Sequence, residues 1–262
     1  MKFHKTVLRM GNLLFNTVFI FLLLVTGIYS AYSLWDDNRI YASVENIQED
    51  MVRIKPEIII TENIDDEEEP APDFSDLLNV NPDVCGWITL ENTQIDYPIL
   101  QGSSNHVYIN KDIYGNFSLA GSIFLDSRNQ RDFSDIYSLV YGHHMANKKM
   151  FGDLELYKDE TFFQNNREGI LILPGCAYRL EIFSCLLVGA AEDNIFEPTV
   201  WKAQNIDRFL KWVRDESVYF HEDVLSDLET TEEDYNILAL STCSYEFSNA
   251  RTIVLALLHP YT

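Results

Sequence analysis

A thiol, an imidazole and a guanidinium stand at the ends of apolar runs in this chain. Cys243 follows one run and Arg251 opens the next, with only the short polar connection 244–250 between them. His143 also follows an apolar run. Short apolar runs bounded by polar residues are typical of strands. The sequence therefore predicts that a thiol, an imidazole and a guanidinium, all groups that can take part in catalysis, lie at strand ends.

Together these side chains could perform acyl transfer at a thiol. A thiolate attacks a carbonyl carbon, an imidazole transfers the proton, and a fixed cation stabilises the oxyanion. A free thiol has a pKa near 8.5, so it needs a neighbouring base or positive charge to react well. Taken singly, Cys243 is better explained as a buried core cysteine, and His143 as a hydrogen-bonded residue at a strand end. Sequence spacing does not show that the three residues meet.

Short strands would have to position these residues. Residues 91–93 form a hairpin-like turn between the first two apolar runs. Helical patterns interrupt the runs at residues 150–163 and again at residues 205–215, where Asn205 is a candidate N-cap. We therefore expect a mainly β fold, an eight-stranded β-barrel with peripheral helices. The strand-like runs are residues 86–90, 95–100, 122–125, 137–141, 169–173, 178–189, 235–240 and 252–258.

The amino-terminal region predicts a membrane anchor. Residues 13–35 carry no charge, and about 20 apolar residues suffice for a helix to cross a bilayer. Basic residues precede this stretch and Asp36 and Asp37 follow it, which places residues 1–12 in the cytoplasm and the rest of the chain outside. The alternative is a cleaved signal peptide, whose apolar region is usually only about 7–15 residues long. We expect an uncleaved, single-pass anchor in the cell membrane.

Charge and composition bound the remaining possibilities. Residues 36–75 are rich in acids, above all in the run 65–69, and are expected to form a partly helical stalk or linker. Residues 76–262 would form the catalytic domain. The net charge of -22 argues against a nucleic-acid partner, because no basic patch is present to replace phosphate counterions.

The four cysteines do not predict disulfides. An even number permits two bridges, but Cys85, Cys176 and Cys185 lie in or beside apolar runs, where a free cysteine behaves as a small hydrophobic residue. No metal or other cofactor is expected. The adjacent pair His143–His144 lacks the ligand spacing of a zinc site.

Several sequence blocks resemble the sortases, the membrane-anchored cysteine transpeptidases of Gram-positive bacteria. The clearest are Leu-Ser-Thr-Cys at 240–243 followed by Arg251, and Tyr-Gly-His-His-Met at 141–145. The resemblance covers residues from about 76 to 259. The amino-terminal anchor and the helix before the last strands look like class B. Further matching blocks are residues 81–88, 95–99, 121–124 and 150–151.

The resemblance implies a mechanism. Cys243 would attack the Thr carbonyl of a sorting-signal peptide, of the Asn-Pro-x-Thr or Ser-Pro-x-Thr kind, and form a thioester. An amine of a cell-wall precursor or of another protein would then accept the acyl group. His143 would act as acid and then base, and Arg251 would hold the carbonyl or oxyanion. By similarity, the substrate contacts would be Asn105, Ile109, Tyr141, Ser241, Ile195 and Phe196.

Two departures and two alternatives remain open from the sequence. Ser244 stands where some class B members have an acidic residue, and the connection from Cys243 to Arg251 is short for the class. One alternative function is a thiol peptidase that passes the acyl group only to water. The other is a catalytically silent, membrane-anchored module that binds peptides.

Overall fold

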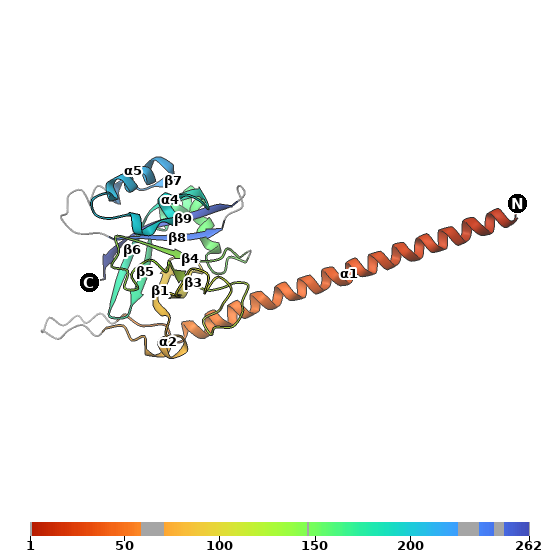
Figure 1. Cartoon of the computed structure of the whole chain (residues 1–262), viewed down its shortest axis with the longest axis horizontal. Helices are drawn as coiled ribbons and strands as arrows, with labels where there is room; N and C mark the ends of the chain where they lie inside the picture. The colour runs from red at the N-terminus through yellow and green to blue at the C-terminus, as the bar shows by residue number, and fades with distance from the viewer. Residues whose placement is uncertain (1, 59–70, 146, 225–235, 244–248, 262) are drawn as a thin grey trace. The chain divides into compact units, whose positions relative to one another are not determined.

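The structure, a computed structural model, describes residues 2–58, 71–145, 147–224, 236–243 and 249–261 (Figure 1). For residues 2–9 and for Cys243 it describes the backbone alone. The chain divides into two compact units, residues 1–43 and residues 44–262. Helix α1 (Lys2–Val52) begins in the first unit and ends in the second.

The larger unit is built on a closed β-barrel. Its strands are β1 (Val84–Leu90), β2 (Asp96–Leu100), β3 (Ile123–Leu125), β4 (Tyr137–Tyr141), β5 (Glu168–Leu173), β6 (Cys176–Gly189), β8 (Asn236–Cys243) and β9 (Ala250–Pro260). Within the described chain they pair in the order β5-β1-β2-β3-β4-β8-β9-β6, and β6 pairs back to β5. This closure leaves no open sheet edge around the ring. The predicted eight-stranded barrel is confirmed.

Two strand pairs of the barrel are parallel, and they decide where the strand ends lie. β2 pairs with β3 and β4 pairs with β8 in parallel, whereas β9 runs antiparallel to β8. Because parallel neighbours end at the same edge of a sheet, the carboxyl ends of β4 and β8 meet. The first residues of β9 lie at that edge too. Residues that follow β4, end β8 and begin β9 are thus brought together.

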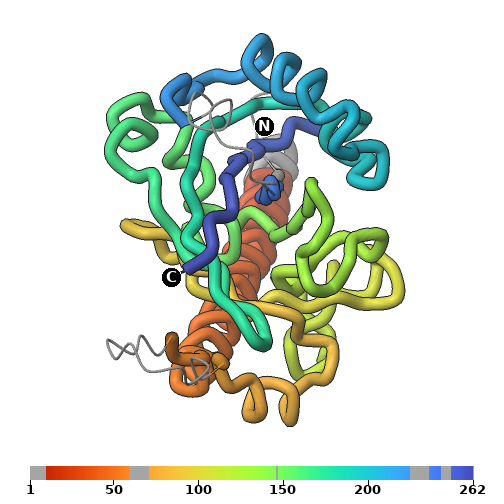
Figure 2. The backbone as a smooth tube through the Cα atoms, turned by 90° about the vertical axis from the view of Figure 1, so that its left-hand side faces the viewer, coloured from red at the N-terminus to blue at the C-terminus, as the bar shows by residue number. Residues whose placement is uncertain are grey.

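The inner strands are buried on both faces. In β8, Leu238 and Leu240 pack in one apolar cluster, whereas Ile237 and Ala239 pack in another. The second cluster includes Phe209 of α5 (Ile206–Glu216), which covers this side of the sheet. Such strands appear in the sequence as unbroken apolar runs, which is why these strands were predicted from it. In Figure 2 the blue segment of β9 runs beside the teal segment of β6, its antiparallel partner.

A ninth strand lies outside the barrel. β7 (Ser217–Phe220) pairs with β6 and follows α5 directly, and the two are drawn together in Figure 1. This strand was not predicted. The helix at residues 206–216 is confirmed, but the side chain of Asn205 does not cap it. Instead its Oδ1 accepts a hydrogen bond of 2.7 Å from the backbone N–H of Lys202.

Short helices fill the connections. The helical stretch predicted at residues 150–163 consists of two helices, the 3₁₀ helix η1 (Gly152–Lys158) and the α-helix α3 (Glu160–Asn165). The side chain of Asp159, the N-cap of α3, accepts a hydrogen bond from the backbone N–H of Phe162. The short helices are α2 (Ser75–Val80), η1 (Gly152–Lys158), α3 (Glu160–Asn165), α4 (Asp193–Phe196) and η2 (Pro198–Val200).

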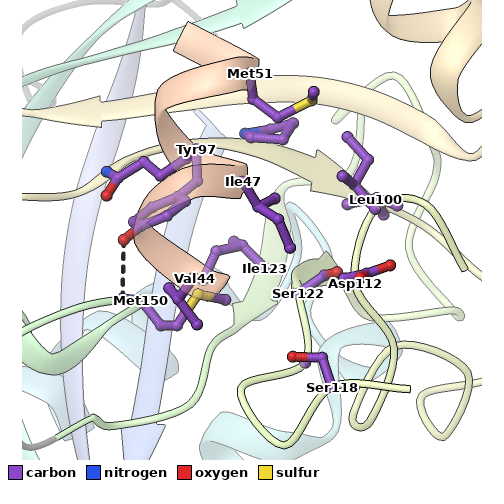
Figure 3. Close-up of a pocket in the computed structure, with 14 residues that line it drawn as sticks. Val44, Ile47, Met51, Tyr97, Leu100, Asp112, Ser118, Ser122, Ile123 and Met150 are labelled. Carbon is purple, nitrogen blue, oxygen red and sulfur yellow. Dashed lines mark hydrogen bonds between the residues drawn. The ribbon is translucent and has the colours of Figure 1, made fainter. Parts of the chain in front are cut away.

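The last two turns of α1 pack on the barrel. Val44 and Met51 are buried, and with Ile47 they point into a small cavity of about 40 Å³ beside β2 and β3 (Figure 3). Just after the helix, Lys55 Nζ donates to Asp96 Oδ1 of β2 at 2.7 Å. Residues 44–55 therefore pack against the barrel as part of the larger unit, with Val44 and Met51 in its core.

The smaller unit carries the apolar part of α1. From Met10 onward the helix is long and apolar enough to cross a membrane, by length and composition. Its side chains from Leu22 to Leu24 are exposed within the unit.

Three cysteines, Cys85, Cys176 and Cys185, lie in the described chain with their side chains. Cys85 and Cys185 are buried, and burial raises the pKa of Cys85 to about 12. Cys176, at the start of β6, is exposed, so the expectation that it packs as a hydrophobic residue is wrong. The β5–β6 hairpin turns immediately before it, which puts its side chain in solvent.

Candidate active site

Cys243 and Arg251 face each other across the β8–β9 ladder. Cys243 is the last residue of β8, and its register partner in β9 is Arg251. The half-buried Arg251 turns one guanidinium nitrogen, Nη1, to the carbonyl oxygen of Ala250 at 2.9 Å. The thiol of Cys243 and residues 244–248, Ser244 among them, lie outside the described part of the chain. The backbone register places the nucleophile candidate and the cation side by side.

His143 reaches the same edge from β4. Tyr141 of β4 pairs with Ser241 of β8, and the ladder continues with the N–H of Gly142 donating to the Ser241 carbonyl at 3.1 Å. His143 follows at once, and its own carbonyl accepts from the N–H of Phe151 at 3.0 Å. The backbone on both sides of the imidazole is therefore fixed by hydrogen bonds.

Gly142 is required by close packing. A Cβ at this position would lie 2.5 Å from Ile123 Cδ1 and 2.6 Å from the ring of Phe151. Both neighbours are buried, so neither has room to yield. Only glycine lets the chain turn from β4 to His143 at this depth.

The imidazole of His143 has a defined partner. Its Nε2 lies 2.9 Å from the carbonyl oxygen of Ile109. A carbonyl oxygen can only accept a hydrogen bond, so Nε2 carries a proton in this arrangement. The ring therefore offers an N–H that could be donated to a leaving group.

These residues surround a groove of about 360 Å³. Its wall includes His143 and Arg251, so the two groups with proton-transfer and oxyanion-binding capacity share one space. Five of the six predicted substrate contacts also line it: Asn105, Ile109, Tyr141, Ser241 and Phe196. The residues that line the groove without having been predicted are Phe124, Gly142, Ala190 and Thr242.

Ile195 does not line the groove. Its side chain is fully buried in the apolar cluster beneath α5, and its carbonyl oxygen accepts from the Tyr137 hydroxyl at 3.0 Å. The next residue, Phe196, faces the groove instead. Neighbouring residues of a short helix point in different directions, so only one of this pair can face the groove.

Stacked aromatic rings form one wall of the groove. The Tyr141 ring lies between those of Phe124, at a centroid distance of 5.2 Å, and Phe196, at 6.4 Å. The Tyr141 hydroxyl donates to Asp126 Oδ2 at 3.0 Å, away from the ring faces. This wall therefore presents apolar ring surface rather than a free hydroxyl.

A buried carboxylate lies behind that wall. The Asp126 side chain is fully buried, and sequence reasoning did not single it out. Burial opposes its ionisation, but the hydrogen bonds from Arg128 outweigh burial, so the pKa of Asp126 is lowered. Its charge also adds to burial in raising the pKa of Tyr141. A buried acid followed two residues later by its arginine has no distinctive sequence pattern.

Among the residues that the structure describes, no group of three or more His, Cys, Asp or Glu side chains is placed to hold a metal ion. Among the described residues that line the groove, His143 supplies an imidazole and Arg251 a guanidinium. With a thiol at the end of β8, this set suits nucleophilic acyl transfer.

Known proteins resemble this chain in sequence and in structure. No family model matches the chain. Sortase B of Staphylococcus aureus is 32% identical over 192 residues, which cover 72% of this chain and 76% of that protein. A class B sortase of Streptococcus pyogenes involved in pilus biogenesis is 37% identical, with a TM-score of 0.64 over 71% of this chain and 97% of the other. The Staphylococcus aureus sortase B–substrate complex has a TM-score of 0.61 at 29% identity, over 72% of this chain and 85% of the other.

Proposed function

Because the chain belongs to the class B sortases, a family of cysteine transpeptidases, we propose that it cleaves a sorting-signal peptide after a Thr residue and transfers the acyl part to an amine. The thioester would form on Cys243. The acceptor would be a cell-wall precursor peptide or an amine of another protein. A solved complex of the Staphylococcus aureus relative with its substrate supports a peptide as the ligand of the groove.

One observation carries this proposal: the shared edge of β4, β8 and β9. The register pairs Cys243 with Arg251, and the parallel β4–β8 pair brings His143 to the same groove. A thiolate beside a guanidinium is stabilised, and the same guanidinium can bind the oxygen of a tetrahedral intermediate.

The first half-reaction follows from these positions. The Cys243 sulfur attacks the Thr carbonyl carbon, and the carbonyl oxygen becomes an oxyanion held by Arg251. The intermediate collapses to a thioester as the C–N bond breaks. In this proposed step Cys243 enters as the thiolate and His143 as the imidazolium. The Nε2 proton passes to the leaving amine, which departs with the carboxyl-terminal part of the peptide and leaves His143 neutral.

The second half-reaction reverses the roles. An amine attacks the thioester carbon, and the now neutral His143 takes the proton that the amine loses. The C–S bond breaks and returns the Cys243 thiolate. Water could replace the amine, and the reaction would then be hydrolysis.

The proposal includes the placement of the protein. Residues 13–35 would span the cell membrane with residues 1–12 in the cytoplasm, and the catalytic domain, residues 76–262, would lie outside. Residues 36–75 would connect the two, and Val44, Met51 and Lys55 of this range pack against the barrel. The apolar stretch of α1 and the basic residues before it support this orientation.

The test uses the full chain in detergent with a panel of x-Pro-x-Thr-Gly and x-Pro-x-Thr-Asn peptides. Each peptide is incubated with and without an amine acceptor, beside a Cys243→Ala control, and products are identified by mass spectrometry. We expect cleavage after Thr, an acceptor-linked product, and loss of both in the control.

Other outcomes point elsewhere. Hydrolysed product alone, at a rate independent of the amine, would identify a thiol peptidase. No cleavage together with a Cys243 thiol that resists alkylation would indicate a silent peptide-binding module. Full activity in Cys243→Ala would overturn the mechanism.

A further inference from the structure

Asp126, just after β3, is hydrogen-bonded to two residues that line the groove. Its Oδ2 accepts from Asn105 Nδ2 at 2.8 Å and from the Tyr141 hydroxyl at 3.0 Å. Asn105 is fixed from its other side as well, because its Oδ1 accepts from the N–H of Ser127 at 2.7 Å. Two groove residues from different parts of the chain are thus oriented by one carboxylate.

Arg128 extends this connection to the segment that follows α4. Its Nε and Nη2 bind Asp126 at 2.9 and 2.8 Å. Nη2 also donates to the carbonyl oxygen of Phe196 at 2.7 Å, and Nη1 donates to Glu197 Oε2 at 2.8 Å. One guanidinium therefore ties the segment after α4 to the buried carboxylate.

The buried carboxylate of Asp126 has hydrogen-bond donors on both of its oxygens. Asp126 receives five hydrogen bonds, because the N–H of Arg128 adds a contact of 3.0 Å to the four from Asn105, Tyr141 and the guanidinium. Carboxylates are rarely buried so fully unless they are paired and hydrogen-bonded, and removing one partner leaves an uncompensated charge. Asp126 and Arg128 consequently act as a unit.

We propose that Asp126 and Arg128 are positioning residues of the peptide groove, which hold Asn105, Tyr141 and Phe196 at the separation that the substrate needs. This inference rests on the proposed function. The pair lies behind the wall and takes no part in the chemistry. Its loss should weaken peptide binding while leaving the reactivity of the thiol unchanged.

A variant series tests each connection in the full chain in detergent, with the best peptide of the panel. Asp126→Asn keeps the shape of the side chain but removes its charge. Arg128→Lys keeps a charge without the planar fork, and Arg128→Gln removes both. Glu197→Gln removes only the outer ion pair, which is half-exposed and should contribute little. The control is Arg214→Gln. Arg214 lies on α5, and the substitution breaks its exposed ion pair with Glu222.

We expect Asp126→Asn and Arg128→Gln to raise KM about tenfold or more with kcat within about threefold of wild type. Arg128→Lys should fall between these variants and Glu197→Gln, and the control should match wild type. The alkylation rate of Cys243 should not change; it is mapped by mass spectrometry because the exposed Cys176 can be alkylated too. A KM near the wild-type value in the folded variants, or a loss confined to kcat and alkylation, would overturn the inference.

Hydrogen–deuterium exchange supplies a readout that needs no substrate. Exchange in residues 101–109 and 193–200 should become faster in Arg128→Gln and stay unchanged in Arg214→Gln. Unaltered exchange would refute the positioning role even if wild type cleaves no peptide. If wild type is inactive but exchange increases, the proposed function fails and the structural connection stands. If Asp126→Asn does not fold, Arg128→Lys and Arg128→Gln decide the question.

Discussion

At the scale of single residues, Arg251 combines two properties that a lysine cannot. Its guanidinium is always charged, and one nitrogen is already turned to the Ala250 carbonyl, so the remaining N–H groups are oriented before substrate binds. Preorganised donors act mainly on the transition state. The contribution of Arg251 should therefore be visible in kcat.

We expect Arg251→Ala to lower kcat by about 10²–10³ with a smaller change in KM, as is typical when an oxyanion donor is removed. Arg251→Lys should recover only part of this loss. Steady-state kinetics with the preferred peptide measure the effect, and thermal unfolding shows whether the fold is intact. An Arg251→Lys variant with the full wild-type kcat would show that charge alone suffices.

Gly142 permits a second prediction at this scale. Gly142→Ala places a methyl group against Ile123 and Phe151, and overpacking of this kind costs about 1–3 kcal/mol. Because His143 is the next residue, kcat should fall even at temperatures where the variant is folded. The matched control is Gly189→Ala, where nothing lies within 4 Å of the new Cβ. Denaturant unfolding and peptide cleavage measure both effects, and equal behaviour of the two variants would contradict the packing argument.

At the scale of elements, His221 couples β7 to α3. Its ring stacks on that of Phe163, with centroids 4.2 Å apart and planes within 8°. Burial first, and then the charge of Arg167, lower the pKa of His221 below its ordinary value. The folded state therefore resists protonation of this ring.

The sign of the resulting pH dependence follows from linkage. Above the unfolded pKa of about 6.5 the ring is neutral in both states, so stability is unaffected. As pH falls below that value the unfolded chain binds the proton more readily, and stability is lost down to the folded pKa. We expect His221→Gln to have a flatter stability curve between about pH 7.5 and 5 than wild type, measured by urea unfolding. Parallel curves would exclude His221 as the cause.

The elements also show what the sequence could predict. β4, β8 and β9 were predicted closely because strands buried on both faces appear as unbroken apolar runs. β7 was missed because it is short and leaves Val218 exposed, so it gives no such pattern.

Which strands pair with one another could not be predicted from the sequence. The β4–β8 pairing joins segments about 100 residues apart in sequence, and no local pattern specifies it. The strand ends that carry Cys243, His143 and Arg251 were predictable, whereas the pairing that brings these ends to one edge of the sheet was not. Asp126 escaped prediction because burial of a charge depends on tertiary partners that the local sequence does not reveal.

At the scale of the whole molecule, the core of the larger unit begins within α1. Val44 and Met51 pack against the barrel, and the Lys55–Asp96 ion pair is half-buried. A protein of residues 44–262 keeps these contacts, and one of residues 76–262 loses them. We expect the shorter protein to be less stable by several kcal/mol, since removal of a buried Met side chain alone costs about 2–5 kcal/mol. Urea unfolding of the two proteins measures the difference, and equal stabilities would show that residues 44–58 are dispensable.

The parallel pair β4–β8 also has a consequence for folding. Contacts between segments so far apart in sequence raise the contact order of the barrel, and the entropy of closing the intervening loop must be overcome before the pair gains any stability. No hairpin or local fragment can bring His143 beside Cys243 ahead of the rest. If these residues form the proposed site, that site is assembled only when the barrel closes. A newly made or partly unfolded chain would then carry the Cys243 thiol without the groups proposed to activate it.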